Sequence, residues 1–332
     1  MKAFEVREFG NLVCTERPQP EPKFGEVLVK VKAVSLNYRD ILMVKGAYNP
    51  HLPLPVIPCS DGVGEVVSVG EGVTKVKPGD RVASIFMQKW LSGNLTTEAA
   101  RSALGGEIDG MLAEYVVLSE DGVVNIPSYL SDIEAATLPC AAVTAWHALI
   151  EAGLKPGETV LVMGTGGVSL FALQFAVMAG ARVIATSSSD EKLARVKQLG
   201  ASDMINYKSV PKWEKQVLAL TEGTGVDYVV EVGGSKTLTQ SLKAVRIGGQ
   251  ISLIGILAGA QAEFNLLPAL MKEVRIQGIF VGSRQMFEAM NRAIDLSQLH
   301  PVCDRIFPFE SAPEALSYME RGSHFGKITI QF

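Results

Sequence analysis

The stretch of residues 158–169, ETVLVMGTGGVS, constrains the fold of this chain more than any other part. Residues 160–162 form an apolar run typical of a buried parallel strand, and residues 168–179 are apolar enough for a helix packed on a sheet. Between them, Gly164, Gly166 and Gly167 allow a tight turn and a close approach of the backbone to a ligand. The pattern predicts a pyrophosphate-binding turn, in which the helix that starts near Val168 presents free amides and its positive dipole end to phosphate oxygens.

Strand and helix signals continue to alternate after this turn. Ser169 stands where the G-x-G-x-x-G pattern has its third glycine, so the motif needs this context as support. The alternation predicts an α/β fold, a doubly wound parallel sheet of the Rossmann type. A glycine turn that binds no nucleotide is the alternative. The expected strands are residues 182–186, 204–206, 226–232 and 250–254, and the expected helices are one capped by Ser189 and followed by Gly200, 212–220 and 236–246.

The first third of the chain has a different texture, with short strands separated by Gly and Pro. These segments, residues 26–33, 62–69 and 78–83, predict a partly open β-barrel. A capping box at Ser131 and Glu134 predicts a helix that leads toward residue 149 and bridges two domains. Residues 301–332 read as strand, helix and strand, without the rhythm of the α/β region. The expected domains are therefore 1–125 with 284–332, and 126–283.

Composition excludes several classes of protein. The chain has 332 residues, 47% of them hydrophobic, and a net charge of −4 without a basic run, which argues against nucleic-acid and anionic-membrane partners. Residues 159–181 carry no charge, but their glycine turn leaves too short a helix to span a bilayer. The cysteines are scattered and form no C-x-x-C pair, as expected for free thiols in a cytoplasmic protein: Cys14, Cys59, Cys140 and Cys303.

Several motifs, in order and spacing, resemble the medium-chain dehydrogenase/reductase superfamily over the whole chain. They are residues 25–31 (GEVLVKV), 37–40 (NYRD), 62–66 (GVGEV), 77–82 (KPGDRV), 138–146 (LPCAAVTAW) and the glycine turn. The resemblance implies a GroES-like partly open β-barrel domain, a Rossmann domain, an active site in the cleft between them and a nicotinamide dinucleotide cofactor.

Zinc-dependent members of that superfamily bind the catalytic metal through a Cys, a His beside a Glu, and a second Cys. By resemblance, these positions fall on Asn37, on Ser60 beside Asp61, and on Cys140. An amide and a hydroxyl are poor zinc ligands, so we expect no metal. An improvised site made of Cys59, Asp61 and Cys140 is the alternative. The cysteine quartet of the structural zinc lobe is absent as well.

The expected absence of a metal bears on the reaction. Zinc can lower the pKa of bound water from about 16 to about 7, which at about 1.4 kcal/mol per unit is an upper bound of about 12 kcal/mol for forming an alkoxide. A quinone or an enone needs less help, because hydride addition places its charge on an oxygen that hydrogen bonds stabilise. We therefore expect an NADPH-dependent, zinc-independent oxidoreductase similar to the quinone oxidoreductase branch. The alternatives are an alcohol dehydrogenase acting on activated allylic or benzylic alcohols or aldehydes, and an NADPH-binding sensor or structural protein with little catalysis.

The resemblance places Asn37 and Tyr48 at the catalytic site. Tyr48 is the candidate hydrogen-bond donor to the substrate oxygen, although it also reads as a loop tyrosine packed on Pro50. Because a phenol has a reference pKa near 10, water is an alternative source of the proton. Asp40 is more typical of a residue that caps or orients a helix. His51 and His147 are weaker candidate acids.

The cofactor preference can be read about 20 residues beyond the glycine turn. An NAD site usually places an acid there, whereas this chain has Ser187, followed by Ser188 and Lys192, which favours the 2′-phosphate of NADPH over NADH. The resemblance adds further cofactor-binding residues: Tyr38, Thr144, Tyr207, Gly233, Gly255, Ile256, Phe280, Val281, Gly282 and Lys327. It also implies a homodimer formed through the strand at residues 273–281, an exposed sheet edge that needs covering.

Overall fold

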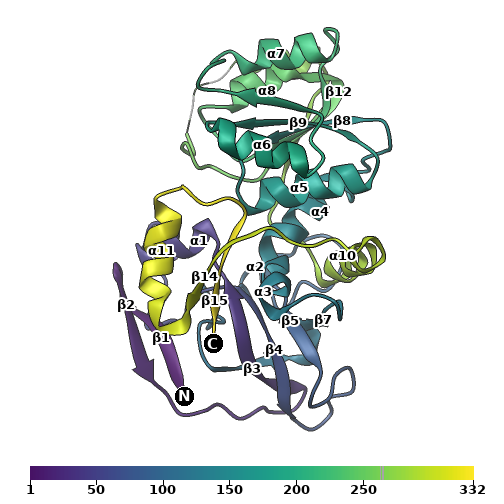
Figure 1. The fold of residues 1–332 in the computed structure, drawn as a ribbon. Coiled ribbons are helices and arrows are strands. Elements are labelled where there is room, and N and C mark those ends of the chain that lie inside the picture. The colour runs from purple at the N-terminus through teal and green to yellow at the C-terminus, as the bar shows by residue number, and fades with distance from the viewer. Residues whose placement is uncertain (262, 264) are drawn as a thin grey trace. The chain divides into compact units, whose positions relative to one another are not determined.

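The computed structural model describes residues 1–261, 263 and 265–332, and the chain forms two compact units. The first unit comprises Met1–Val143 and Val281–Phe332, and the second comprises Thr144–Phe280 (Figure 1). Within the described residues, no helix is long and apolar enough to cross a membrane.

The second unit is built on a six-stranded sheet in which every pair of neighbouring strands is parallel, in the order β10-β9-β8-β11-β12-β13. The order reverses direction between β8 and β11, which makes this the point where an open parallel sheet receives a ligand. The strands are β8 (Thr159–Met163), β9 (Arg182–Ser187), β10 (Asp203–Asn206), β11 (Val226–Glu231), β12 (Val245–Leu253) and β13 (Arg275–Gly278).

Helices cover both faces of this sheet. In Figure 1, α7 and α8 lie on one side of the strands, and α5 and α6 lie on the other. Val160 and Leu161 of β8 are completely buried, as a strand covered on both faces must be. The helices of this region are α4 (Val143–Leu149), α5 (Gly167–Met178), α6 (Asp190–Gln198), α7 (Trp213–Leu220), α8 (Leu238–Ala244) and α9 (Leu267–Met271).

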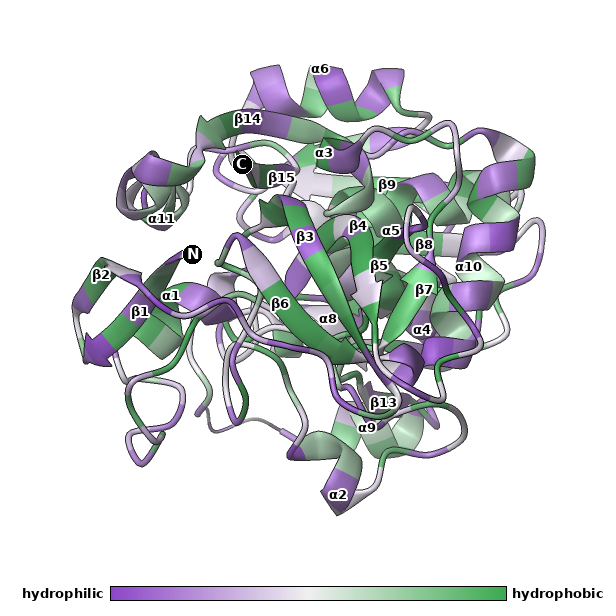
Figure 2. Ribbon diagram, turned by 90° about the horizontal axis from the view of Figure 1, so that it is seen from below, coloured by the Kyte–Doolittle hydropathy of each residue, from purple (hydrophilic) through white to green (hydrophobic). Residues whose placement is uncertain are grey.

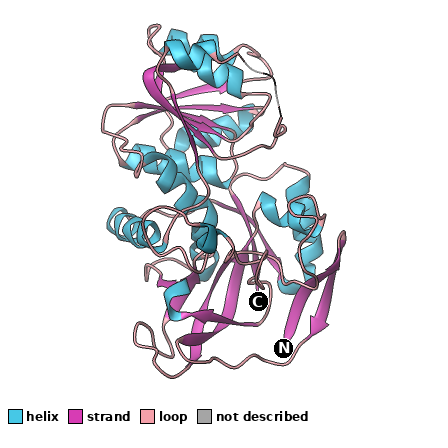
Figure 3. Ribbon diagram, turned by 180° about the vertical axis from the view of Figure 1, so that it is seen from behind, coloured by secondary structure: helices cyan, strands magenta, loops and turns pink. Residues whose placement is uncertain are grey.

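The first unit contains a seven-stranded sheet in the order β14-β15-β3-β4-β5-β7, with β6 paired to β3. Figure 3 shows these strands with both chain ends in the same unit. The last strand, β15, pairs antiparallel with β3, so the tail returns to the N-terminal region as the sequence predicts. The strands are β3 (Glu26–Ser35), β4 (Asp61–Val69), β5 (Arg81–Ser84), β6 (Tyr115–Ser119), β7 (Val123–Asn125), β14 (Cys303–Pro308) and β15 (Lys327–Gln331), with β1 (Lys2–Glu8) and β2 (Asn11–Glu16) forming a separate pair.

The core of the first unit lies on the inner face of this sheet. Val27, Val29 and Val31 alternate along β3 and are buried with Ile328 and Ile330 of β15. The apolar stretch of β6 is visible in Figure 2. The helices are α1 (Tyr38–Val44), α2 (Thr97–Ala100), α3 (Asp132–Ala135), α10 (Arg284–Ser297) and α11 (Ala312–Glu320), with a π-helical turn, η2 (Leu138–Ala142), and two 3₁₀ turns, η1 (Glu120–Gly122) and η3 (Phe309–Ser311).

The structure differs from the sequence-based expectation in three places. The helix predicted for residues 236–246 ends at Ala244, because Val245 already pairs with Val226 in the sheet. Residues 126–143 belong to the first unit rather than the second, since α3 packs on β3 and β4 and Arg81 forms an ion pair with Asp132. Helix α10 was not predicted.

Candidate active site

The turn from β3 into α1 places Asn37 at the start of the helix. Its backbone is extended, with φ −121° and ψ 152°, and its backbone N–H donates to the Asp40 carboxylate over 2.7 Å. Asp40 is completely buried, and burial raises its pKa from 3.8 to about 6. The prediction that Asp40 orients a helix is confirmed, because its carboxylate holds the residue that precedes α1.

A buried lysine contacts the side chain of Asn37. Lys327, at the start of β15, is 4% exposed, and its ammonium group donates to Asn37 Oδ1 and to the Leu36 carbonyl, each over 2.6 Å. The same nitrogen lies 3.8 Å from Asp61 Oδ2. Within the described residues, the other half of the Asn37 amide, Nδ2, is buried and has no hydrogen-bond partner.

Asp61 is the anionic centre of this cluster. Besides the lysine, its carboxylate accepts hydrogen bonds from Ser60 Oγ over 2.7 Å, Ser35 Oγ over 3.3 Å and the backbone N–H of Cys140 over 3.2 Å. A buried carboxylate is tolerated when a cation and donors surround it, and Asp61 has both.

Tyr48 lies beside a stacked arginine. The Arg39 guanidinium is 4.3 Å from the centroid of the Phe86 ring and 5.8 Å from that of Tyr48, and it donates to the Leu104 carbonyl. Burial raises the pKa of Tyr48 above its usual value, and the positive charge of Arg39 only partly opposes that shift. The Tyr48 phenol is therefore a neutral hydrogen-bond donor and a poor source of protons at neutral pH.

The residues at the zinc positions do not fit a zinc ion. Among the residues that the structure describes, no group of three His, Cys, Asp or Glu side chains is arranged to hold a metal. The Asp61 carboxylate is already paired with Lys327, whose positive charge would repel a second cation. Burial, with a further contribution from Asp61, raises the pKa of the Cys140 thiol to about 12. A zinc ion would have to displace the lysine and remove this proton.

The glycine turn of the second unit has the expected geometry. Gly164, directly after β8, has φ +75°, and Gly166 is the N-cap of α5. At both glycines a Cβ atom would meet nothing within 4 Å, so the turn faces open space. Ser169 is buried, and its hydroxyl donates to the Met163 carbonyl over 2.7 Å. The serine that replaces the third glycine therefore ties α5 to the end of β8.

The residues predicted to set the preference for NADPH over NADH lie in the segments that follow β9 and β10. Ser187 is buried, its carbonyl accepts from the backbone N–H of Tyr207, and its hydroxyl accepts from the backbone N–H of Ser189. The Ser189 hydroxyl in turn accepts from the backbone N–H of Lys192, which confirms the predicted cap of α6. Asp190, the first acidic residue after Ser187 in the sequence, accepts a hydrogen bond from Asn206.

The turn after β11 is organised by a buried acid that the sequence analysis missed. Glu231 is completely buried, and its Oε1 accepts from the backbone N–H groups of Gly233 and Gly234 and from the Thr237 hydroxyl. Its Oε2 accepts from Ser241 Oγ over 2.5 Å. A charged residue directly after the apolar residues 228–230 of the strand was the available signal. Gly233 therefore belongs to an ordered turn at the carboxyl end of β11, next to the glycine turn at the carboxyl end of β8.

The remaining predicted residues are distributed over both units. Thr144 in α4 is buried, Ile256 after β12 is 55% exposed, and a Cβ atom at Gly255 would lie 2.4 Å from the Val232 carbonyl. Phe280 belongs to the second unit, whereas Tyr38, Val281, Gly282 and Lys327 belong to the first. His51 lies in an exposed loop, and its backbone N–H donates to Asn49.

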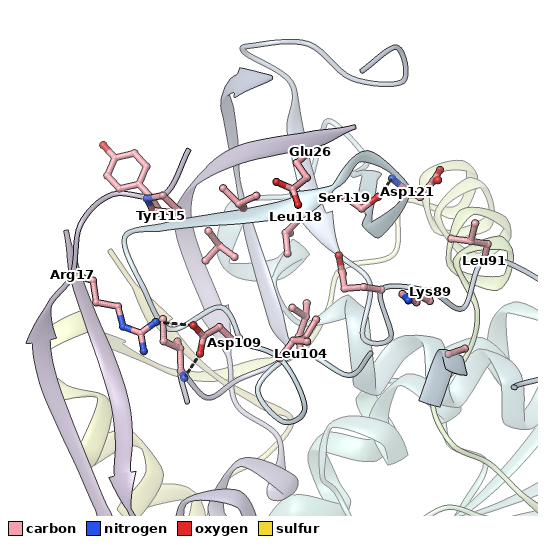
Figure 4. Close-up of a pocket in the computed structure, with 18 of the residues that line it drawn as sticks. Arg17, Glu26, Lys89, Leu91, Leu104, Asp109, Tyr115, Leu118, Ser119 and Asp121 are labelled. Carbon is pink, nitrogen blue, oxygen red and sulfur yellow. Dashed lines mark hydrogen bonds and ion pairs between the residues drawn. The ribbon is translucent and has the colours of Figure 1, made fainter. Parts of the chain in front are cut away.

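The first unit also contains a cavity of about 780 Å³, and Asp61 and Lys327 do not line it. Arg17, Glu26, Tyr115 and Asp121 line it, and Asp109 there accepts hydrogen bonds from Arg17 and from the backbone of Ile57 (Figure 4). Neither Asn37 nor Tyr48 faces this cavity. The candidate active site rests on the Asn37 cluster because the unpartnered amide and the buried ion pair lie there.

Comparisons with known proteins agree with this architecture. Residues 23–128 match the alcohol dehydrogenase GroES-like domain, and residues 167–296 match the zinc-binding dehydrogenase family. The chain is 49% identical to a zinc-type alcohol dehydrogenase-like protein of Schizosaccharomyces pombe, over 98% of this chain and 97% of the relative. It is 29% identical to an acryloyl-coenzyme A reductase of Metallosphaera sedula, over 99% of this chain and 96% of that protein.

Solved structures are similar over the full length. A putative alcohol dehydrogenase from Sinorhizobium meliloti 1021 superposes with a TM-score of 0.94 at 44% identity, covering 100% of this chain and 98% of that one. An NAD-dependent alcohol dehydrogenase superposes with a TM-score of 0.92 at 36% identity, with both chains covered completely. The chain therefore belongs to the medium-chain dehydrogenase/reductase superfamily, as an alcohol dehydrogenase-like oxidoreductase with a GroES-like domain and a Rossmann domain.

Proposed function

We propose that this protein is an NADPH-dependent reductase of quinones or α,β-unsaturated carbonyl compounds that works without zinc. The observation that carries the proposal is the Lys327–Asp61 pair, which puts an internal cation beside residues that, by resemblance, correspond to the zinc positions. The acryloyl-coenzyme A reductase among the relatives, by its name, acts on a conjugated carbonyl compound. A conjugated acceptor suits hydrogen-bond donors, because the electron pair displaced by hydride comes to rest on an oxygen atom.

The proposed cofactor site lies at the carboxyl ends of the parallel strands of the second unit. The open glycine turn and the N-terminus of α5 would hold the pyrophosphate, and Ser187, Ser188, Lys192 and Tyr207 would surround the 2′-phosphate. The reduced nicotinamide supplies a hydride ion to the electrophilic carbon of the acceptor. Ser187 stands at the end of β9 in place of an acid, and the Asp190 carboxylate already accepts a hydrogen bond from Asn206. Both features favour NADPH over NADH.

In the first unit, Asn37 and Tyr48 are the proposed donors to the acceptor's oxygen. The Asn37 amide has N–H groups without a partner among the described residues, and the Tyr48 phenol is held neutral by its raised pKa. Water is the proposed source of the proton that follows the hydride, because Tyr48 gives up its own proton reluctantly.

The proposal is tested with purified protein that has been treated with 1,10-phenanthroline and checked for metal content. Oxidation of NADPH and NADH is followed at 340 nm with menadione, 2-cyclohexenone and crotonaldehyde. We expect turnover that survives chelation and prefers NADPH. The absence of turnover with every acceptor would contradict the proposal.

A second candidate is an alcohol dehydrogenase, which the printed names of several relatives favour. Benzyl alcohol and allyl alcohol with NADP⁺ or NAD⁺ are the matching substrates. Oxidation of these alcohols that is lost on chelation and restored by zinc would establish this reading. Tight binding of NADPH without turnover of any compound would instead indicate a sensor.

We further propose that the protein is a cytoplasmic homodimer. Strand β13 is the edge of the Rossmann sheet, and all four of its residues are exposed. Apolar side chains near it are exposed as well: Ile247 at 68%, Leu270 at 74%, Met271 at 70% and Ile276 at 38%. An exposed edge with apolar side chains favours pairing with a second copy.

A further inference from the structure

We propose that Lys327 is a positioning residue, which locks the Asn37 amide so that its Nδ2 group donates a hydrogen bond to the substrate oxygen. The proposal rests on the function proposed above and deepens it, because it assigns a task to a lysine that family resemblance places at the cofactor. Three observations carry it: the contacts of the ammonium group, the anchoring of Asp61, and the unpartnered half of the amide.

The ammonium group decides which end of the amide faces inward. A lysine ammonium has three donors and no acceptor, so only the carbonyl oxygen of an asparagine can face it. Lys327 Nζ lies 2.6 Å from Asn37 Oδ1. A flipped amide would place N–H groups against a cation. Nδ2 must therefore face away from Lys327.

The lysine itself is held on its other sides. It donates to the Leu36 carbonyl over 2.6 Å and lies 3.8 Å from Asp61, which is fixed by Ser60 and by the backbone of Cys140. Lys327 is 4% exposed, so it is not a freely moving surface side chain. The amide is thus held by a chain of contacts that starts at β4 and η2.

The third observation is the half of the amide that faces away from Lys327. Within the described residues, Asn37 Nδ2 is buried and has no acceptor. Buried donors normally have partners, so an empty one requires an explanation. A carbonyl oxygen that gains negative charge during hydride transfer is an acceptor of the right kind. Tyr48 is the second donor proposed for the same oxygen.

The Asn37→Asp variant tests the donor directly. An aspartate keeps an acceptor oxygen for Lys327 and adds an opposite charge, so the variant should fold, but its second oxygen cannot donate when ionised. We expect kcat to fall about 100-fold or more, in line with the loss of one donor to a developing oxyanion, with an unchanged Kd for NADPH and an undiminished Tm. Retention of wild-type kcat would overturn the proposal.

Variants of Lys327 separate positioning from cofactor binding. Lys327→Met frees the amide, and we expect kcat to fall about 10-fold or more while the Kd for NADPH stays the same. Lys327→Arg, which keeps donors and charge, should recover part of the lost activity. A rise in the Kd for NADPH with kcat retained would assign Lys327 to the cofactor instead. Lys89→Met, which removes an exposed lysine of the same unit, is the matched control.

A second variant guards against misfolding. Lys327→Met alone leaves the Asp61 carboxylate buried without its cation, whereas the double variant Asp61→Asn with Lys327→Met is neutral and keeps an acceptor for Ser60 and Cys140. We expect the double variant to fold and to have the low kcat of Lys327→Met. Wild-type kcat in the folded double variant would overturn the proposal.

An activity-independent measurement separates this inference from the proposed reaction. The side-chain amide of Asn37 is observed by NMR after ¹⁵N-asparagine labelling and is assigned by its loss in Asn37→Asp. With NADP⁺ bound, addition of 2-cyclohexenone or benzyl alcohol should shift this signal in the wild type and not in Lys327→Met. A shift without turnover would defeat the proposed reaction and support the donor role. The absence of a shift with both compounds would overturn the donor role.

Discussion

At the scale of single residues, buried titratable groups are the most testable feature of the first unit. Asp40 keeps the backbone of Asn37 in place, yet it is buried near a second carboxylate, Asp61, which adds to the effect of burial on its pKa. The folded chain therefore binds the Asp40 proton more tightly than the unfolded chain does.

This pKa shift predicts that the free energy of unfolding depends on pH. With a pKa of 3.8 unfolded and about 6 folded, the stabilisation from protonated Asp40 is fully present below pH 3.8 and is lost as the pH rises through about 6. At about 1.4 kcal/mol per unit, the loss is about 3 kcal/mol. Asp40→Asn, which is neutral and still accepts from Asn37, should gain about that much stability relative to the wild type between pH 4 and pH 7.5, measured by urea unfolding.

A matched control lies on the surface. Asp80 accepts a hydrogen bond from the backbone of Lys77, three residues before it, as Asp40 does from Asn37, but it is only partly buried. Asp80→Asn removes one negative charge from the same unit, and the gain in unfolding free energy of Asp40→Asn between pH 4 and pH 7.5 should exceed that of Asp80→Asn. Parallel curves for Asp40→Asn would show that Asp40 has an ordinary pKa.

At the scale of elements, side-chain hydrogen bonds order the turns at the carboxyl ends of the parallel strands. Each turn is held differently: Ser169 ties α5 to β8, Ser189 caps α6, and Glu231 organises the turn between β11 and α8. These contacts fix backbone N–H groups before any ligand arrives, which lowers the entropic cost of binding.

Glu231 offers a test at this scale. Glu231→Ala would leave the N–H groups of Gly233 and Gly234 and two hydroxyl groups without their acceptor, which should cost about 3 kcal/mol of unfolding free energy. Glu231→Gln keeps one acceptor oxygen and should cost about 1 kcal/mol. Urea unfolding gives both values, and fluorescence titration should show weaker NADPH binding for Glu231→Ala. Equal stability of all three proteins would show that the turn does not depend on this acid.

Helix α10 shows what the sequence analysis overlooked among the elements. Ser283 caps it by accepting from the backbone N–H of Met286, and Phe287, Met290 and Ile294 form its buried side. The spacing of these apolar residues was a readable helix signal.

At the scale of the whole molecule, the dimer proposal can be tested at β13. Ile276→Lys places a charge on the exposed edge strand, and desolvating it in an interface would be unfavourable. Light scattering coupled to gel filtration should show a dimer for the wild type and a 35.6 kDa monomer for the variant. Leu296→Lys replaces a residue that is 89% exposed on α10 and should remain dimeric. An unchanged mass for Ile276→Lys would contradict the role of this edge.

Most of the architecture can be predicted from local sequence patterns. Gly164 was singled out as a turn residue and has a positive φ, Ser131 and Glu134 form the expected capping box, and residues 273–281 contain the edge strand. Such features depend on backbone sterics and on neighbours within a few residues, so a single sequence is enough to predict them. The α/β fold followed from the order of strands and helices.

The candidate site required the tertiary structure. The sequence identified Asn37, Asp61 and Lys327 one at a time and showed that two of the expected zinc positions hold an amide and a hydroxyl, which are poor zinc ligands. Only the sheet register, in which β15 pairs with β3 and β3 pairs with β4, brings Lys327 to Asn37 across 290 residues and to Asp61. Pairing between distant strands depends on the packing of the whole core, so no local pattern reports that a lysine holds the asparagine amide.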